Sequence, residues 1–254
     1  MKISTRSIVG GLAVAALLAF SSATIVTAAS PVVAGGPAGK GVCATQASGA
    51  QAGASIETLR AFGDCEVARR MTTLGNLEAK ISGSKYLTGS DASALSAEVA
   101  TTKTGLTALK AQIDAETSLD ALKAEVKQIA TEFRVYLLVV PQVNLVNGAD
   151  AVGTAKATFD TVSTKLAARI AAEKAAGKDT TAAQADLDAM NAAVTQAAGL
   201  AQPLPATLLA LTPAQWNAGT AGPVLTSARA ALVQARGLLK TARADAVACR
   251  DALK

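Results

Sequence analysis

Hydrophobic residues recur every three or four positions along most of the chain, a spacing that places them on one face of an α-helix. In the C-terminal part this seam comprises Leu225, Ala228, Leu232, Ala235, Leu239, Ala242, Ala246, Cys249 and Leu253. Similar stripes predict helices at 56–81, from Ser90 or Asp91 to about Thr117, from Asp179 or Thr180 to about Ala197, and at 223–253. Between the last two, a short helical turn is expected at Thr212-Pro213, with Gln215 completing a capping box.

The longest periodic stretch, Leu119–Ala176, predicts a central helix against which the shorter helices bury their apolar stripes. Pro141 must bend or break this helix, because proline has no amide hydrogen to donate to the preceding turn. Asn147-Gly148 is a second weak point. Two arrangements stay open: a kinked helix that continues to Ala176, or a chain that turns back near Asn147. The continuous helix is favoured by an 11-residue repeat of stripe positions across the gap, namely Leu122, Phe133, Asn144, Ala155 and Leu166.

Residues 1–29 have the pattern of a secretory signal peptide. Lys2 and Arg6 precede an apolar segment, and small residues suited to signal peptidase follow it. An uncleaved membrane anchor is the alternative, although the apolar run is short for a bilayer span. Residues 30–55 are rich in Gly, Ala and Ser without a helical period, which predicts a flexible arm. Residues 56–254 are the predicted helical domain.

Half of the residues are hydrophobic but only 3% are aromatic, and much of the hydrophobic share is alanine, the strongest helix former. The sequence therefore predicts an all-α fold, an elongated antiparallel helical bundle with coiled-coil-like heptads and one long central helix. The formal net charge of +5 falls to +3 when Lys2 and Arg6 leave with the signal peptide. This excess is small for a nucleic-acid binder, and no nucleic-acid-binding motif is present.

The chain contains no histidine. Ser-His-Asp and Cys-His nucleophilic catalysis, imidazole-ligated zinc and His-ligated haem are therefore excluded. The acids Glu132, Asp150 and Asp160 on or near the central helix do not form a pair in the apolar setting that a general acid needs. We therefore expect no enzyme activity, and no catalytic, metal-binding or cofactor-binding residues.

The most regular charge pattern is a row of arginines spaced by seven in the last helix: Arg229, Arg236, Arg243 and Arg250. One interpretation is an anion-facing strip for a wall polymer, lipid headgroups or an acidic partner. The other, which we favour from sequence, is a flank whose methylene stems cover the core and whose charges pair with a neighbouring helix. In an antiparallel helix pair, Asp186 would meet Arg243. Asp179 would likewise meet Arg250.

The three cysteines of an exported chain suggest one disulfide and one free thiol. We expect Cys65 and Cys249 to form the disulfide, which would tie the first helix to the last and close a long loop. Pairing of Cys43 with Cys65 is the main competitor. If all three are reduced, Cys249 is a small residue of the apolar seam.

The segment 135–146 is largely apolar on all sides but is too short to span a bilayer as one helix. We interpret it as a buried segment at the centre of the fold. A membrane-inserting segment, as in helical pore-forming proteins, is one alternative function. Another is a small-molecule carrier with a hollow interior, in which Tyr136 would be a candidate haem ligand.

Three motifs carry a resemblance to a group of proteins: Arg69-Arg70-Met71-x-x-Leu74, Gly105-Leu106-x-x-Leu109-x-x-x-Ile113 and Phe133-Arg134-Val135-Tyr136-x-Leu138-Val139-x-Pro141-Gln142. Over about residues 60–250 the chain resembles uncharacterised exported all-helical proteins of high-GC Gram-positive bacteria. The resemblance implies an envelope or extracellular setting and carries over no functional residue.

The leader, the heptads and the arginine row together favour a structural or adaptor function. We expect a secreted or envelope-associated module that binds another envelope protein, or an anionic wall or lipid component. Binding of nucleic acid is not expected, and self-association into a homo-oligomer stays open.

Overall fold

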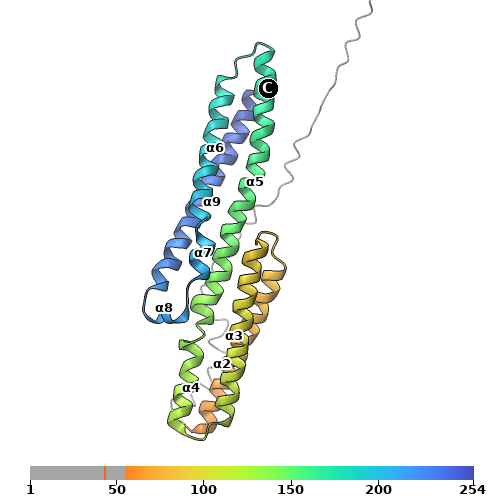
Figure 1. Ribbon diagram of the computed structural model, residues 1–254. Helices are drawn as coiled ribbons and strands as arrows, with labels where there is room; N and C mark the ends of the chain where they lie inside the picture. Colours follow the sequence, from red (N-terminus) through yellow and green to blue (C-terminus); the bar gives the residue numbers. More distant parts are fainter. Residues whose placement is uncertain (1–42, 44–54) are drawn as a thin grey trace, which may run out of the picture. The chain divides into compact units, whose positions relative to one another are not determined.

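The computed structural model describes Cys43 and residues 55–254 (Figure 1). Of these residues, 86% are helical and none lies in a strand, so the all-α prediction is confirmed. The predicted signal peptide at 1–29 lies outside the described residues. The predicted arm also lies outside them, apart from Cys43 and Ser55.

Helix boundaries lie within a few residues of those predicted from the apolar pattern. In chain order the elements are α2 (Ile56–Ser82), α3 (Gly89–Ala115), α4 (Leu119–Thr131), the π-helix η1 (Val135–Val139), α5 (Val140–Ala175), α6 (Thr181–Ala201), α7 (Leu204–Leu209), α8 (Pro213–Asn217) and α9 (Ala221–Ala252). The capping box of Thr212 and Gln215 at α8 is as predicted. The cap of α3 is not, because Thr88, rather than Ser90 or Asp91, accepts the hydrogen bond from the first turn.

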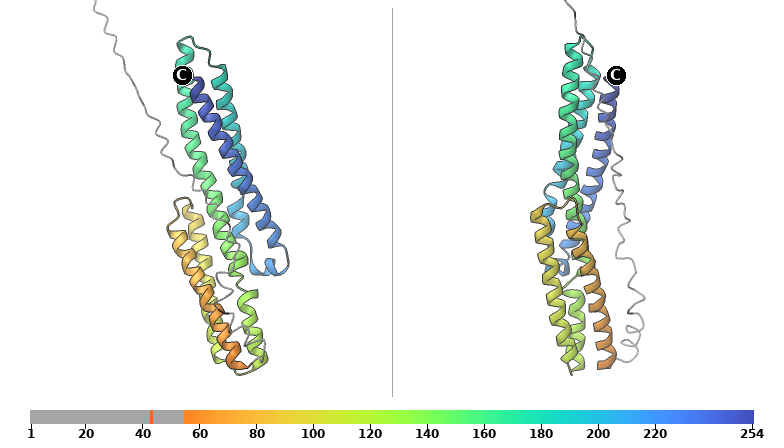
Figure 2. Two further views of the ribbon diagram at one scale, coloured as in Figure 1. Left: turned by 180° about the vertical axis from the view of Figure 1, so that it is seen from behind. Right: turned by 90° about the vertical axis from the view of Figure 1, so that its right-hand side faces the viewer.

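Two hydrophobic clusters hold the described helices together. The first joins α2, α3, α4 and η1 to the N-terminal halves of α5 and α9. The second joins the C-terminal halves of α5 and α9 to α6. Helices α6 and α9 run side by side in opposite directions, and α5 lies along both (Figures 1 and 2). The predicted seam of α9 is buried throughout, except that Leu239 is only partly buried.

The central stretch breaks at a place that the sequence analysis did not predict. Helix α4 ends at Thr131, Arg134 adopts the left-handed conformation with φ of 43°, and the chain resumes as η1. Pro141 is the second residue of α5, directly after η1, and the backbone stays helical through Val139 and Val140. Asn147-Gly148 lies inside the same helix. The favoured helix that continues to about Ala176 is confirmed from Val140 onward, whereas the alternative turn near Asn147 is wrong; the break lies ahead of Pro141, at 132–134.

Helix α8 spans the break. The Asn217 side-chain amide donates to the carbonyl of Thr131, the last residue of α4, at 2.9 Å. The Arg134 Nε donates to the Asn217 carbonyl oxygen at 2.8 Å. One asparagine thus bonds to both sides of the break, which supports the left-handed residue that a non-glycine side chain otherwise disfavours.

The apolar segment 135–146 is mostly buried, as we interpreted it. Within it Gln142 is fully buried, and its side-chain amide donates to the carbonyls of Leu208 and Leu211 at 2.9 and 3.1 Å. Counted as one helix across the break, residues 119–175 are long and apolar enough to cross a membrane, but 56% of the most apolar window is buried within the protein. A core helix of a soluble protein passes the same test.

Candidate functional site

Helix α9 presents a basic face to solvent. Arg229, Arg236, Lys240 and Arg243 are exposed and lie on one side of the helix, because their spacing of three, four and seven matches the helical period. Val233 lies among them and is 64% exposed, the most exposed large hydrophobic residue described. We call these five residues the α9 basic face.

The ion pairs predicted between α6 and α9 do not form. Arg250 instead pairs with its neighbour Asp251 at 2.9 Å, and Asp179 accepts from the backbone amide of Thr181 at 2.9 Å. Arg250 and Asp179 thus already have partners close by in sequence. Asp186 lies beside Cys249, whose pKa its charge raises, so the register of α6 against α9 does not bring it to Arg243. No carboxylate lies within ion-pairing distance of the α9 basic face among residues 55–254.

Arg236 partly fits the interpretation that the side chains of the arginine row cover the core. A Cβ added to Gly148 of α5 would lie 3.1 Å from the Leu232 side chain and 3.5 Å from Arg236 Nη2. The Arg236 side chain therefore lies along α5, where the absence of a side chain at Gly148 lets α9 approach closely. Arg236 therefore covers part of the core, and it has no carboxylate partner among residues 55–254.

The expected Cys65–Cys249 disulfide is wrong. The disulfide joins Cys43 to Cys65, and Cys249 is a buried free thiol on the seam of α9. Burial, followed by the negative charge of Asp186, raises the pKa of the Cys249 thiol. Cys249 therefore behaves as the small core residue that was one of the open interpretations.

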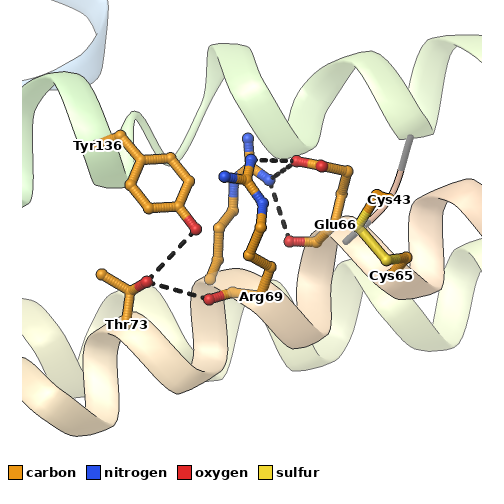
Figure 3. A network of polar contacts seen from close by, with 7 residues as sticks. Cys43, Cys65, Glu66, Arg69, Thr73 and Tyr136 are labelled. Atoms are coloured by element: carbon orange, nitrogen blue, oxygen red, sulfur yellow. Dashed lines mark hydrogen bonds and ion pairs between the residues drawn. A yellow bond between two sulfur atoms is a disulfide. The ribbon is translucent and has the colours of Figure 1, made fainter. Parts of the chain in front are cut away.

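Beside the disulfide lies a polar cluster that sequence reasoning did not identify (Figure 3). Glu66 on α2 accepts hydrogen bonds through Oε2 from Arg69, at 2.7 Å, and from Arg70. Across the gap, the ring of Tyr136 from η1 lies over both guanidinium groups, 4.4 Å from Arg69 and 5.3 Å from Arg70. Thr73 donates to the Tyr136 hydroxyl at 3.4 Å. We call these five residues the Glu66 cluster.

Charges within the Glu66 cluster keep its acid ionised. Burial on its own raises the pKa of Glu66, but the hydrogen bonds from Arg69 and Arg70, together with their charges, outweigh it and lower the pKa overall. Arg70 is only 7% exposed. The sequence signals for this cluster were the adjacent Arg69 and Arg70 and, in a separate motif, Tyr136. Nothing in the sequence indicated that these two segments lie in contact.

Neither a metal site nor a catalytic constellation was found among the described residues. No group of three or more His, Cys, Asp and Glu that could hold a metal ion occurs in Cys43 and 55–254. Burial raises the pKa of Glu98 to about 7. Among residues 55–254, no hydrogen bond joins Glu98 to a nucleophile or to a second acid. Tyr136, the candidate haem ligand, faces the arginines of the Glu66 cluster.

The chain matches no family model, no curated protein and no solved structure.

Proposed function

We propose that the protein is an exported helical adaptor, a rigid bundle with coiled-coil-like packing that binds an acidic segment of another envelope protein through the α9 basic face. The carrying observation is that Arg229, Arg236, Lys240 and Arg243 lie exposed on one side of α9 without a carboxylate partner among the described residues. The Cys43–Cys65 disulfide supports a location outside the cytoplasm, because such bonds persist in oxidising compartments.

The geometry of the face favours an extended, acidic partner. Residues seven apart on a helix are separated by about 10.5 Å along its axis, which exceeds the Debye length of about 8 Å at physiological ionic strength. The three arginines are therefore partly screened from one another, whereas Lys240 lies only about 6 Å from Arg236 and about 4.5 Å from Arg243 along the axis and adds to the positive charge there. The exposed Val233 adds an apolar contact between them, which a protein segment can match and an anionic polymer cannot.

Chemical cross-linking on the native cell envelope tests this function. The test variant replaces Arg229, Arg236 and Arg243 with glutamine. The control variant replaces Lys85, Lys127 and Lys165 with glutamine. These lysines are exposed on or near other helices and have no ion-pair partner among residues 55–254. The two variants therefore change the net charge equally. We expect one discrete protein, identified by mass spectrometry and bound by the wild type and the control, to be lost with the test variant.

The other outcomes would redirect or reject the proposal. Capture of lipid or wall polymer that disappears in high salt would assign the face to an anionic surface instead. Equal capture by both variants would refute a role for the arginines. Self-cross-links alone would indicate a homo-oligomer.

The two alternative functions receive no specific support. Pore formation requires segment 135–146 to leave the core, where Val135, Leu138, Val139, Val143 and Val146 are at most 2% exposed. Release of dye from liposomes by the purified protein would nevertheless revive it. A carrier would retain a ligand through purification, which mass spectrometry under native conditions detects.

A further inference from the structure

The Glu66 cluster contains more positive than negative charge. Two guanidinium groups share the single carboxylate of Glu66, and no second acid lies within ion-pairing distance of Arg69 or Arg70 in the described part of the chain. Residues 1–54 contain no Asp or Glu, so the N-terminal segment joined here through Cys43 has no carboxylate side chain to contribute. A buried charge without a counter-charge is destabilising.

Unpaired donors accompany this excess charge. The Nε atoms of Arg69 and Arg70 are both buried and have no hydrogen-bond acceptor among the described residues. The Thr73 hydroxyl lies 3.4 Å from the Tyr136 hydroxyl and also donates to the Arg69 carbonyl at 3.1 Å. Buried donors are usually satisfied, and leaving one unpaired is unfavourable. Two donors therefore lie unused in one positively charged cluster.

We infer that the Glu66 cluster binds a small oxyanion, which supplies the missing negative charge and accepts from the two arginines. The anion reaches the cluster from the side of Arg69, whose side chain is 26% exposed, compared with 8% for Arg70. The guanidinium groups supply the charge-assisted hydrogen bonds that carboxylates and phosphates prefer. This site lies on α2 and η1 and does not depend on the α9 basic face.

Titration of the mature protein with inorganic phosphate tests the site. The readout is the arginine Nε–H resonances in nitrogen-15 NMR, at constant ionic strength maintained with chloride. We expect saturable shifts at Arg69 and Arg70, and a saturable rise in the unfolding temperature that chloride does not produce. Arg69→Gln should weaken binding by about tenfold or more, whereas Lys127→Gln, at an exposed position of α4, should leave it unchanged.

Tyr136→Phe is the second variant, because it keeps the ring on the guanidinium groups and removes only the hydroxyl. It should fold normally and bind phosphate as tightly as the wild type, because the Tyr136 hydroxyl faces Thr73. A parallel titration with acetate separates a phosphate ligand from a carboxylate ligand. Shifts that increase linearly without saturation, or that are the same in wild type and Arg69→Gln, would overturn the inference.

Discussion

Replacement of Glu66 by glutamine tests the energetics of the Glu66 cluster, because it keeps the shape of the side chain and removes its charge. Loss of one member of a buried ion pair costs about 3–5 kcal/mol, mostly because the remaining charge is left unpaired. The Glu66 side chain is 14% exposed, so solvent screens the change in part. We therefore expect Glu66→Gln to lower the free energy of unfolding by about 2–4 kcal/mol, and the unfolding temperature by roughly 5–12 °C.

Glu78→Gln is the matched control. Glu78 pairs with Lys103 at 2.9 Å, but the two side chains are 41% and 31% exposed, and exposed pairs contribute about 0–1 kcal/mol. Urea unfolding followed by circular dichroism at pH 7 gives the free energy of unfolding of both variants. The loss for Glu66→Gln should persist in high salt, whereas any loss for Glu78→Gln should disappear.

The pH dependence gives an independent check. The folded-state pKa of Glu66 lies below its ordinary value of 4.5, so its stabilisation is present above pH 4.5 and is lost as the pH falls through the folded-state pKa. The difference in free energy of unfolding between wild type and Glu66→Gln should therefore become smaller below about pH 4. If Glu66→Gln and Glu78→Gln are equally stable at neutral pH, the cluster has no special energetic role.

Three further predictions use the same unfolding measurement. A Cβ at Gly105 would lie 2.5 Å from the Phe133 ring, whereas a Cβ at Gly75 would have no neighbour within 4 Å. Gly105→Ala should therefore destabilise the protein by about 1–3 kcal/mol relative to Gly75→Ala. Equal stabilities of the two variants would contradict this. The pKa of Glu98 is about 7 when folded against 4.5 unfolded, so stability should fall as the pH rises from about 4.5 to 8, and Glu98→Gln should remove about 1–2 kcal/mol of that fall after solvent screening. Reduction of the disulfide, which closes a loop of 22 residues, should cost about 3 kcal/mol, and an unchanged urea midpoint would refute the loop-closure argument.

The sequence by itself determined which segments are helical and which face of each is buried. The three-four spacing of apolar residues is a local property of the chain, and it located α2, α3, α6 and α9 to within a few residues. The Thr212–Gln215 capping box was equally predictable, because it needs only residues three apart. The spacing of the arginines on α9 also followed from helical geometry.

Only the tertiary structure decided which distant residues meet. Proline at 141 suggested a break, but packing placed it in the first turn of α5 and moved the break to Arg134, where Asn217 supplies the bonds. The partner of Cys65 likewise depended on proximity in space. The Glu66 cluster joins α2 to a tyrosine in η1. A sequence pattern reports the neighbours of a residue along one helix, whereas such contacts depend on how the helices turn and pack against one another.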